Sequence, residues 1–360
     1  MSQLRLERLR AAVADIHLDA VLITDPLNRR YLTGHRGGDH GLTESGGVAL
    51  ISPDRALLLA DRNNLAWVAA EAEPIFDVQA WERPWINSVA TIAGQQNWTR
   101  IGFEDSAMLV STHAALTGLL GDDRTLVPIG ARATLLRAIK DADEITILGR
   151  AIRLTDRVAV EATALLAAGI TERELARRID DLFRAGGSEG PSFPTTVASG
   201  PNSSRPHHAS SSRAIQENEP IIIDMGARMD GYCADLTRTF WIGSPTPQYE
   251  SVYNAVARAH SAALARVRAG VPLADIDRAA RESLAADGFE ANVIHSVGHG
   301  VGLEIHEAPS VSIAAEGRLE AGQVVTIEPG VYFPDWGGVR IEDVVLVTED
   351  GCRVLSAAPK

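Results

Sequence analysis

Residues 221–237, IIIDMGARMDGYCADLT, contain the pattern that decides the fold of this chain. Asp224 directly follows three isoleucines. A carboxylate after so apolar a run is expected to be buried, and a buried carboxylate must be paired with a positive charge or bind a metal ion. Asp230-Gly231 is a strong signal for a two-residue hairpin turn. With that turn, Asp224 faces Thr237, and Asp235 lies on the same face, diagonally across the two strands. The sequence therefore predicts a hairpin that presents two carboxylates to one point.

A second acidic pair lies nearer the C-terminus. The first hairpin alone leaves open that Asp235 merely pairs with an arginine such as Arg238. Glu328 and Glu342, however, lie on two apolar stretches joined by residues 334–337, and a loop centred near Trp336 would place them opposite each other. The second pair favours a metal site over the arginine alternative.

One imidazole lies between the two acidic pairs in the sequence Gly298-His299-Gly300-Val301-Gly302. The glycines leave the ring of His299 accessible and allow another group to approach it closely. Four crowded carboxylates cannot all stay ionised in an empty site, whereas two divalent cations would balance them. This oxygen-rich set suits Mn²⁺ or Co²⁺ best, with Zn²⁺ or Fe²⁺ as further possibilities. A pair of such metals activates water, so the constellation predicts hydrolysis.

The chain has 360 residues, a length typical of two domains. Short alternating helix and strand patterns predict an α/β domain over residues 1–128. Residues 129–360 begin with a long helical pattern that stops at Gly169, followed by a capping box at Thr171-x-x-Glu174. Similar signals for the end of one helix and the start of the next recur 101 residues later, where Gly270 corresponds to Gly169. We interpret the second domain as two related helix–helix–sheet halves; chance similarity between helix ends is the alternative.

The composition excludes several partners. The formal net charge of −13 argues against nucleic acid as a partner, and no apolar run approaches the roughly 20 residues that span a membrane. The N-terminal sequence has no apolar region typical of a secretory signal. Two cysteines, Cys233 and Cys352, cannot build a disulfide framework. We expect a cytoplasmic protein.

The five candidate ligands occur in the order and spacing of a known family. Residues 130–360 resemble the pita-bread metallopeptidases, which include methionine aminopeptidase, aminopeptidase P and prolidase. Residues 337–343, GGVRIED, and residues 28–34, NRRYLTG, are similar to the prolyl-peptidase branch. The resemblance implies an α/β N-terminal domain followed by an α+β pita-bread catalytic domain with an internal pseudo-two-fold repeat.

The resemblance also implies roles for individual residues. Asp224 would bind one metal ion, His299 and Glu328 the other, and Asp235 and Glu342 both. Glu328 would in addition exchange a proton with the nucleophilic water.

Three further residues enter through the same resemblance. His207 matches a histidine that contacts the substrate or leaving group, although a solvated histidine in the polar loop 200–212 is the alternative. His306 matches one that stabilises the developing oxyanion, and Arg340 is expected to bind substrate.

The implied activity is a dinuclear, metal-dependent exopeptidase that cleaves the Xaa-Pro bond at the N-terminus of di- and short peptides. Residues 306–312 lack the arginine that many prolidases carry there, so we expect tripeptides to be cleaved as well as dipeptides. A broad aminopeptidase without proline preference and a creatinase-like hydrolase are alternatives among enzymes. A non-catalytic pita-bread binding module is the alternative from another class. The resemblance further implies a homodimer, with loop 34–40 a candidate to reach the partner's active site.

Overall fold

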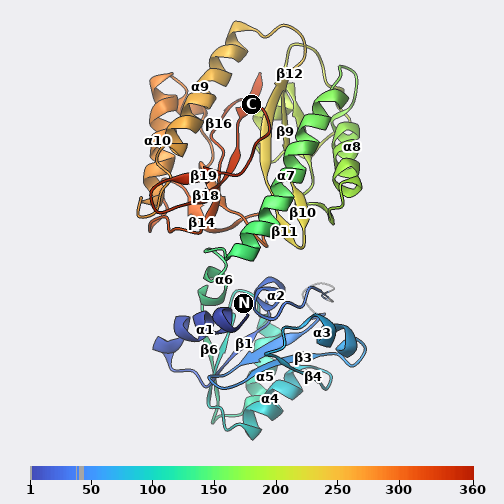
Figure 1. The fold of residues 1–360 in the computed structure, drawn as a ribbon, viewed down its shortest axis with the longest axis vertical. Coiled ribbons are helices and arrows are strands. Elements are labelled where there is room, and N and C mark those ends of the chain that lie inside the picture. Colours follow the sequence, from blue (N-terminus) through green and yellow to red (C-terminus); the bar gives the residue numbers. More distant parts are fainter. Residues whose placement is uncertain (1, 38, 40–43) are drawn as a thin grey trace. The chain divides into compact units, whose positions relative to one another are not determined.

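The computed structural model describes residues 2–37, 39 and 44–360, and the chain divides into two compact units, Met1–Arg137 and Ala138–Lys360 (Figure 1). The division follows Arg137 and not the predicted 128/129 boundary. The reason is that the segment after residue 128 stays with the first unit, where Arg8 Nη2 donates to the carbonyl of Leu136 over 3.0 Å. Gly38 and His40 of the predicted dimer loop lie outside the described residues. None of the described helices is both long and apolar enough to cross a membrane.

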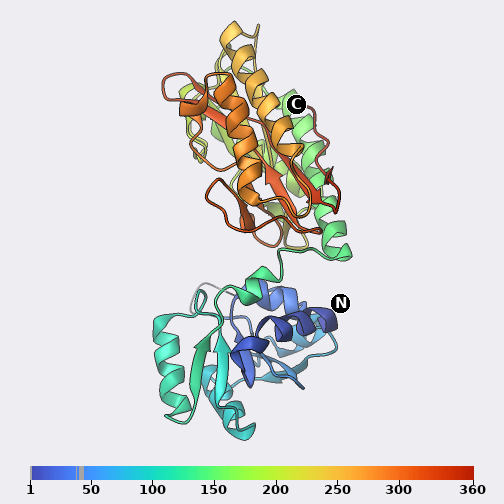
Figure 2. The same ribbon diagram turned by 90° about the vertical axis from the view of Figure 1, so that its left-hand side faces the viewer.

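The first unit is the predicted α/β domain. Its six-stranded sheet has the order β4-β3-β2-β1-β5-β6, with β1–β2 and β2–β3 antiparallel and the other pairs parallel. Helices α4 and α5 pack on one face of this sheet, and α1 and α2 lie on the other side (Figure 2). The elements are α1 (Ser2–Ala12), η1 (Ala14–Ile16), β1 (Ala20–Ile23), α2 (Pro26–Thr33), β2 (Val48–Ile51), β3 (Ala56–Ala60), α3 (Leu65–Glu71), β4 (Asp77–Ala80), α4 (Ile86–Gln95), β5 (Arg100–Phe103), α5 (Val110–Leu120), β6 (Thr125–Pro128) and α6 (Arg132–Leu135).

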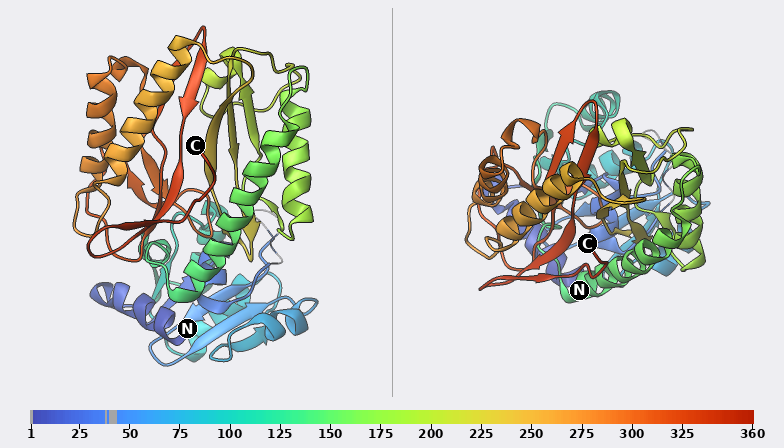
Figure 3. Two further views of the ribbon diagram at one scale, coloured as in Figure 1. Left: turned by 45° about the horizontal axis from the view of Figure 1, so that its top comes forward. Right: turned by 90° about the horizontal axis from the view of Figure 1, so that it is seen from above.

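The second unit consists of two halves, each with a helix pair outside and strands inside (Figures 1 and 3). The first half contains α7 (Ala142–Leu165), α8 (Glu172–Ala185), β7 (Gly190–Pro191), β8 (Thr196–Ser199), η2 (Gly200–Ser204), β9 (Pro220–Met225), β10 (Ala227–Met229), β11 (Tyr232–Cys233) and β12 (Leu236–Trp241). The second contains α9 (Pro247–Leu264), α10 (Leu273–Ala286), η3 (Glu290–Asn292), β13 (Gly298–Gly300), β14 (Glu307–Val311), β15 (Val324–Ile327), β16 (Gly330–Phe333), β17 (Gly337–Arg340), β18 (Asp343–Val347) and β19 (Cys352–Val354).

The glycines that suggested the repeat adopt equivalent conformations in the two halves. Gly169 and Gly270 have φ of 92° and 81°, in the left-handed region that favours glycine. Each follows the first helix of its half, although α7 already ends at Leu165 and not at Gly169 as expected. Thr171 caps α8 by accepting from the backbone N–H of Glu174. These equivalences agree with the predicted internal repeat.

Because side chains alternate along each strand, the strands of each half have one face packed against the helices and the other directed to the interior of the unit. Ile221, Ile223 and Met225 of β9 pack into one apolar cluster with α7 and α8. Val325, Ile327, Val339 and Ile341 do the same against α9 and α10. Because side chains alternate along a strand, residues 222, 224, 328 and 342 face the opposite way. The core thus directs the acidic residues toward one another.

Candidate metal centre

The first carboxylate pair lies on the predicted hairpin. Asp230 and Gly231 adopt φ of 44° and 73°, as a two-residue hairpin turn requires. Met229 pairs with Tyr232 and Asp224 with Thr237, which is the predicted register. Asp235 precedes Thr237 by two residues. Both carboxylates therefore share the face that points away from α7 and α8.

The second carboxylate pair, Glu328 and Glu342, follows from a single antiparallel register that runs from β15 and β18 into β16 and β17. Ile327 pairs with Asp343, and Gly330 pairs with Arg340 in the same register. Glu328 consequently lies opposite Glu342, as predicted. The turn is centred on Asp335 and not on Trp336, because Phe333 pairs with Gly337.

His299 brings the two carboxylate pairs together. Its Nε2 lies 3.3 Å from Glu328 Oε1 and 3.6 Å from Asp235 Oδ2. Ligand atoms of Asp235, His299 and Glu342 all lie within 4.8 Å of one another. The other ring nitrogen, Nδ1, lies 3.0 Å from the carbonyl oxygen of Gly300, which fixes the ring orientation. Four of the five predicted ligands thus lie together, and the charge of the fifth, Asp224, acts on Asp235.

Crowding perturbs every acid in this cluster. Burial, followed by the charges of Glu328 and Asp224, raises the pKa of Glu342 to about 8. Burial and the charge of Glu342 raise the pKa of Asp235 well above its ordinary value. Burial also opposes ionisation of Glu328, but the hydrogen bond and positive charge of His299 lower its pKa to about 2. The same contact overcomes the burial of His299 and raises the pKa of that imidazole to about 9.

The donor set fits divalent cations. Asp224 Oδ1 and Glu342 Oε1 are buried and have no hydrogen-bond partner among the described residues. Buried carboxylate oxygens need hydrogen bonds or a metal ion. Added positive charge at this point would also relieve the repulsion that raises the pKa values of Asp235 and Glu342. We conclude that this cluster is suited to hold divalent metal.

Arg340 lies in a different setting from the one expected for a substrate-binding residue. Its side chain is 3% exposed, and its Nη2 donates to Asp224 Oδ2 over 2.7 Å. Nε donates to Thr237 Oγ1 and Nη1 to Tyr332 Oη, each over 2.9 Å. Three of its donors are thus directed to protein atoms, and the side chain holds a ligand of the cluster in place.

The two other predicted histidines lie on exposed loops. His207 follows η2, and His306 precedes β14. The ring of His306 stacks edge-on against His299, with centroids 4.4 Å apart. Burial and then the charge of His299 lower the pKa of His306, with a smaller lowering from His207. His207 therefore lies close enough to act electrostatically on His306.

Sequence reasoning missed His295 and Tyr332. His295 Nε2 lies 2.8 Å from Tyr332 Oη, and the same hydroxyl oxygen accepts a hydrogen bond from Arg340 Nη1. Strand alternation could have found Tyr332, because it shares its face with Glu328 and Gly330. The glycine makes room for it: a Cβ at Gly330 would lie 2.6 Å from Tyr332 Oη. His295, four residues before His299, had only its proximity in sequence as a signal.

The sequence also matches known proteins along its whole length. Residues 146–349 match metallopeptidase family M24, and residues 5–139 match the creatinase/prolidase N-terminal domain. An Xaa-Pro dipeptidase of Pyrococcus furiosus is 32% identical over 357 residues, which cover 98% of this chain and 97% of that protein.

Two solved structures share the fold throughout. An Xaa-Pro dipeptidase from Bacillus anthracis matches with a TM-score of 0.95 and 31% identity, covering 100% of this chain and 99% of the other. An X-Pro aminopeptidase from Thermotoga maritima matches with a TM-score of 0.88 and 32% identity, covering 98% of each chain. Similarity therefore extends over both units.

Proposed function

Because this chain belongs to metallopeptidase family M24, we propose that it removes the N-terminal residue that precedes proline from dipeptides and short peptides. The observation that carries the proposal is the convergence of four carboxylates and His299 on one point of the second unit. Proline as the second residue is supported by the relatives named Xaa-Pro dipeptidase and X-Pro aminopeptidase.

The five clustered residues would hold two divalent ions: Asp224 one ion, His299 and Glu328 the other, and Asp235 and Glu342 both. Bound divalent ions polarise a carbonyl group and make water a stronger nucleophile near neutral pH. We propose Mn²⁺ or Co²⁺, with Zn²⁺ or Fe²⁺ as further options, because oxygen ligands outnumber the single imidazole. Metal analysis of the purified active protein tests this choice.

The residues of the chain itself would manage the protons of the reaction. Glu328 has its two carboxylate oxygens near His299 Nε2 and, at 3.9 Å, Arg340 Nε. We assign it to accept a proton from the attacking water and deliver it to the departing imino nitrogen of proline. His306 stabilises the developing oxyanion, and His207 contacts the substrate or leaving group. Arg340 acts by holding Asp224.

A peptide panel tests the proposed specificity. With added Mn²⁺ or Co²⁺, the protein should hydrolyse Ala-Pro and Ala-Pro-Ala much faster than Ala-Ala and Ala-Ala-Ala, and a chelator should abolish the activity. Equal rates with and without proline would favour the broad aminopeptidase. Metal binding without hydrolysis of any peptide would favour the binding module.

Two properties of the whole protein complete the proposal. We place it in the cytoplasm, because Cys233 and Cys352 are both free thiols. We also propose a homodimer. Light scattering and cell fractionation test these two statements independently of the activity.

A further inference from the structure

His207 and His306 have the same local arrangement. Both are exposed, and in both cases the next residue turns its side chain into the protein. His208 is buried, and the Glu307 side chain is only 2% exposed. Because each exposed histidine shares a peptide unit with its inward neighbour, whatever holds that neighbour limits where the histidine can point.

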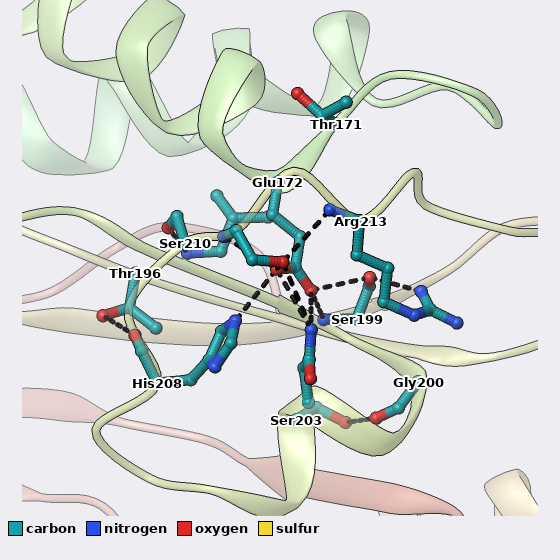
Figure 4. A network of polar contacts seen from close by, with 12 residues as sticks. Thr171, Glu172, Thr196, Ser199, Gly200, Ser203, His208, Ser210 and Arg213 are labelled. Carbon is teal, nitrogen blue, oxygen red and sulfur yellow. Dashed lines mark hydrogen bonds and ion pairs between the residues drawn. The ribbon is translucent and has the colours of Figure 1, made fainter.

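Glu172 holds His208. It is the first residue of α8, it is fully buried, and its Oε2 lies 2.9 Å from His208 Nε2 (Figure 4). The same carboxylate accepts hydrogen bonds from the backbone N–H and hydroxyl of Ser199 and of Ser211. Both ends of the loop that carries His207 are therefore tied to the start of α8, where a negative charge is favourable.

Lys140 holds Glu307. Its Nζ lies 2.7 Å from Glu307 Oε1, and its side chain is fully buried. Lys140 is itself fixed through its backbone N–H, which donates to the carbonyl of Gly322. Gly302 provides the space for this pair, because a Cβ there would lie 2.2 Å from Glu307 Oε1. An ion pair this deeply buried resists separation, because each charge left alone would be strongly unfavourable.

We infer that His208 and Glu307 are positioning residues: held by Glu172 and Lys140, they set the directions of His207 and His306 at the substrate. The inference rests on the proposed function, in which the two exposed histidines contact the substrate and stabilise the oxyanion. Its physical basis is the narrow tolerance of catalysis, in which a displacement of about 1 Å costs up to about a hundredfold in rate. Neither positioning residue is one of the five proposed metal ligands.

Double-mutant cycles test the inference with Ala-Pro as substrate. His208→Gln and Glu307→Gln should each lower kcat/KM by about tenfold or more, with metal content unchanged. Added to His207→Ala, His208→Gln should cause no further loss, and the same should hold for Glu307→Gln added to His306→Ala. In the crossed combinations, such as His208→Gln with His306→Ala, the two fold-losses in kcat/KM should multiply. Losses that multiply within each pair as well would overturn the inference, because a general structural defect behaves that way.

Matched variants separate this result from poor folding. Glu174→Gln changes a partly exposed carboxylate on the same helix and should leave activity unchanged. If His208→Gln does not fold, Ser211→Ala, which removes one hydroxyl donor from Glu172, takes its place in the same cycle. For the second pair, Lys140→Arg should keep most of the activity that Lys140→Met loses, and equal losses would contradict the inference.

The two proposals also fail differently. If the unchanged protein with added metal cleaves no Xaa-Pro peptide, the proposed function is wrong. If it does cleave them, and His207→Ala and His306→Ala are impaired but the couplings are absent, only the positioning inference is wrong.

Discussion

At the scale of single residues, Arg340 shows where sequence reasoning reached its limit. Alternation along the strand places it beside Glu342, so its presence at the site could be expected. Its donors, however, reach Asp224, which lies 116 residues earlier in the chain. Only the packing of one half against the other reveals that contact, in which the residue expected to bind substrate supports a proposed metal ligand.

Glu342 offers a direct test of the metal assignment. Glu342→Gln keeps the shape of the side chain and removes one of the charges proposed to bridge the metals. The variant should lose at least one metal ion per chain, and kcat/KM should fall by more than about a hundredfold. Elemental analysis beside kinetics measures both effects.

The control for this substitution is Glu316→Gln, an exposed carboxylate in the same half, which should change neither quantity. Without metal, Glu342→Gln should be no less stable than the unchanged protein, because burial and neighbouring carboxylates already disfavour the Glu342 charge. Full metal content and full activity in the variant would contradict the assignment.

Glu172 makes a contribution to stability that depends on pH. Burial alone would raise its pKa, but hydrogen bonds from Ser211, Asn202 and His208 lower it to about 2 from an ordinary value of 4.5. A group whose pKa is depressed by folding stabilises the protein above its unfolded pKa, and this stability is lost as the pH falls through the folded pKa. The free energy of unfolding should therefore drop by about 3 kcal/mol from this group between pH 6 and pH 2.

Urea unfolding at a series of pH values measures this effect. Glu172→Gln should be less stable than the unchanged protein at pH 6, and the difference should shrink as the pH approaches 2. Glu316→Gln, at an exposed carboxylate in the other half, should not show this convergence. A constant difference between pH 6 and pH 2 would show that the carboxylate charge is not responsible.

At the scale of elements, the two hairpins are the part of the site that sequence predicts best. Turn chemistry at Asp230-Gly231 sets one register, and continuous alternation from residue 324 to 347 sets the other. Both are local properties, since each hairpin's partners lie close in sequence. The sequence predicts the ends of helices less well, because α7 stops at Leu165 although no glycine marks that position.

Gly231 should therefore be sensitive to substitution. It has φ of 73°, and an alanine in this left-handed conformation is disfavoured by about 1–2 kcal/mol. Gly231→Ala should lower the free energy of unfolding by about that amount. Gly149→Ala, inside α7 of the same unit, should instead raise it by up to about 1 kcal/mol. Urea denaturation compares the two, and equal effects of the same sign would refute the argument.

At the scale of the whole molecule, the order of elements and the repeat were predictable, because glycines and helix starts recur along the chain. Contacts between distant segments were not. Lys140 and Glu307 are 167 residues apart, and neither carries a signal that would pair it with the other. The same holds for the network around Glu172, where an ordinary helix-start glutamate becomes the anchor of a loop.

Peptide length is the remaining property of the whole enzyme, and the structure sharpens its prediction. A strict dipeptidase must recognise the free carboxylate beside proline, a task suited to the forked guanidinium of arginine. Residues 306–312 contain no arginine, and Arg340 is buried with its guanidinium bonded to Asp224 and Tyr332. Little would then penalise a substrate whose chain continues past proline. We expect Ala-Pro-Ala and Ala-Pro to be cleaved with kcat/KM values within about tenfold of each other.

Steady-state kinetics on the two peptides, with Ala-Pro-amide as a third substrate, decides the question. The amide removes the terminal negative charge without lengthening the chain, so it separates recognition of charge from recognition of size. All three should react at similar rates if no clamp exists. A preference for Ala-Pro above about a hundredfold, or about 2.7 kcal/mol of transition-state discrimination, over both other peptides would mean that an arginine elsewhere binds the carboxylate. Arg205→Met would then be the first variant to make, because Arg205 is exposed and lies two residues before His207.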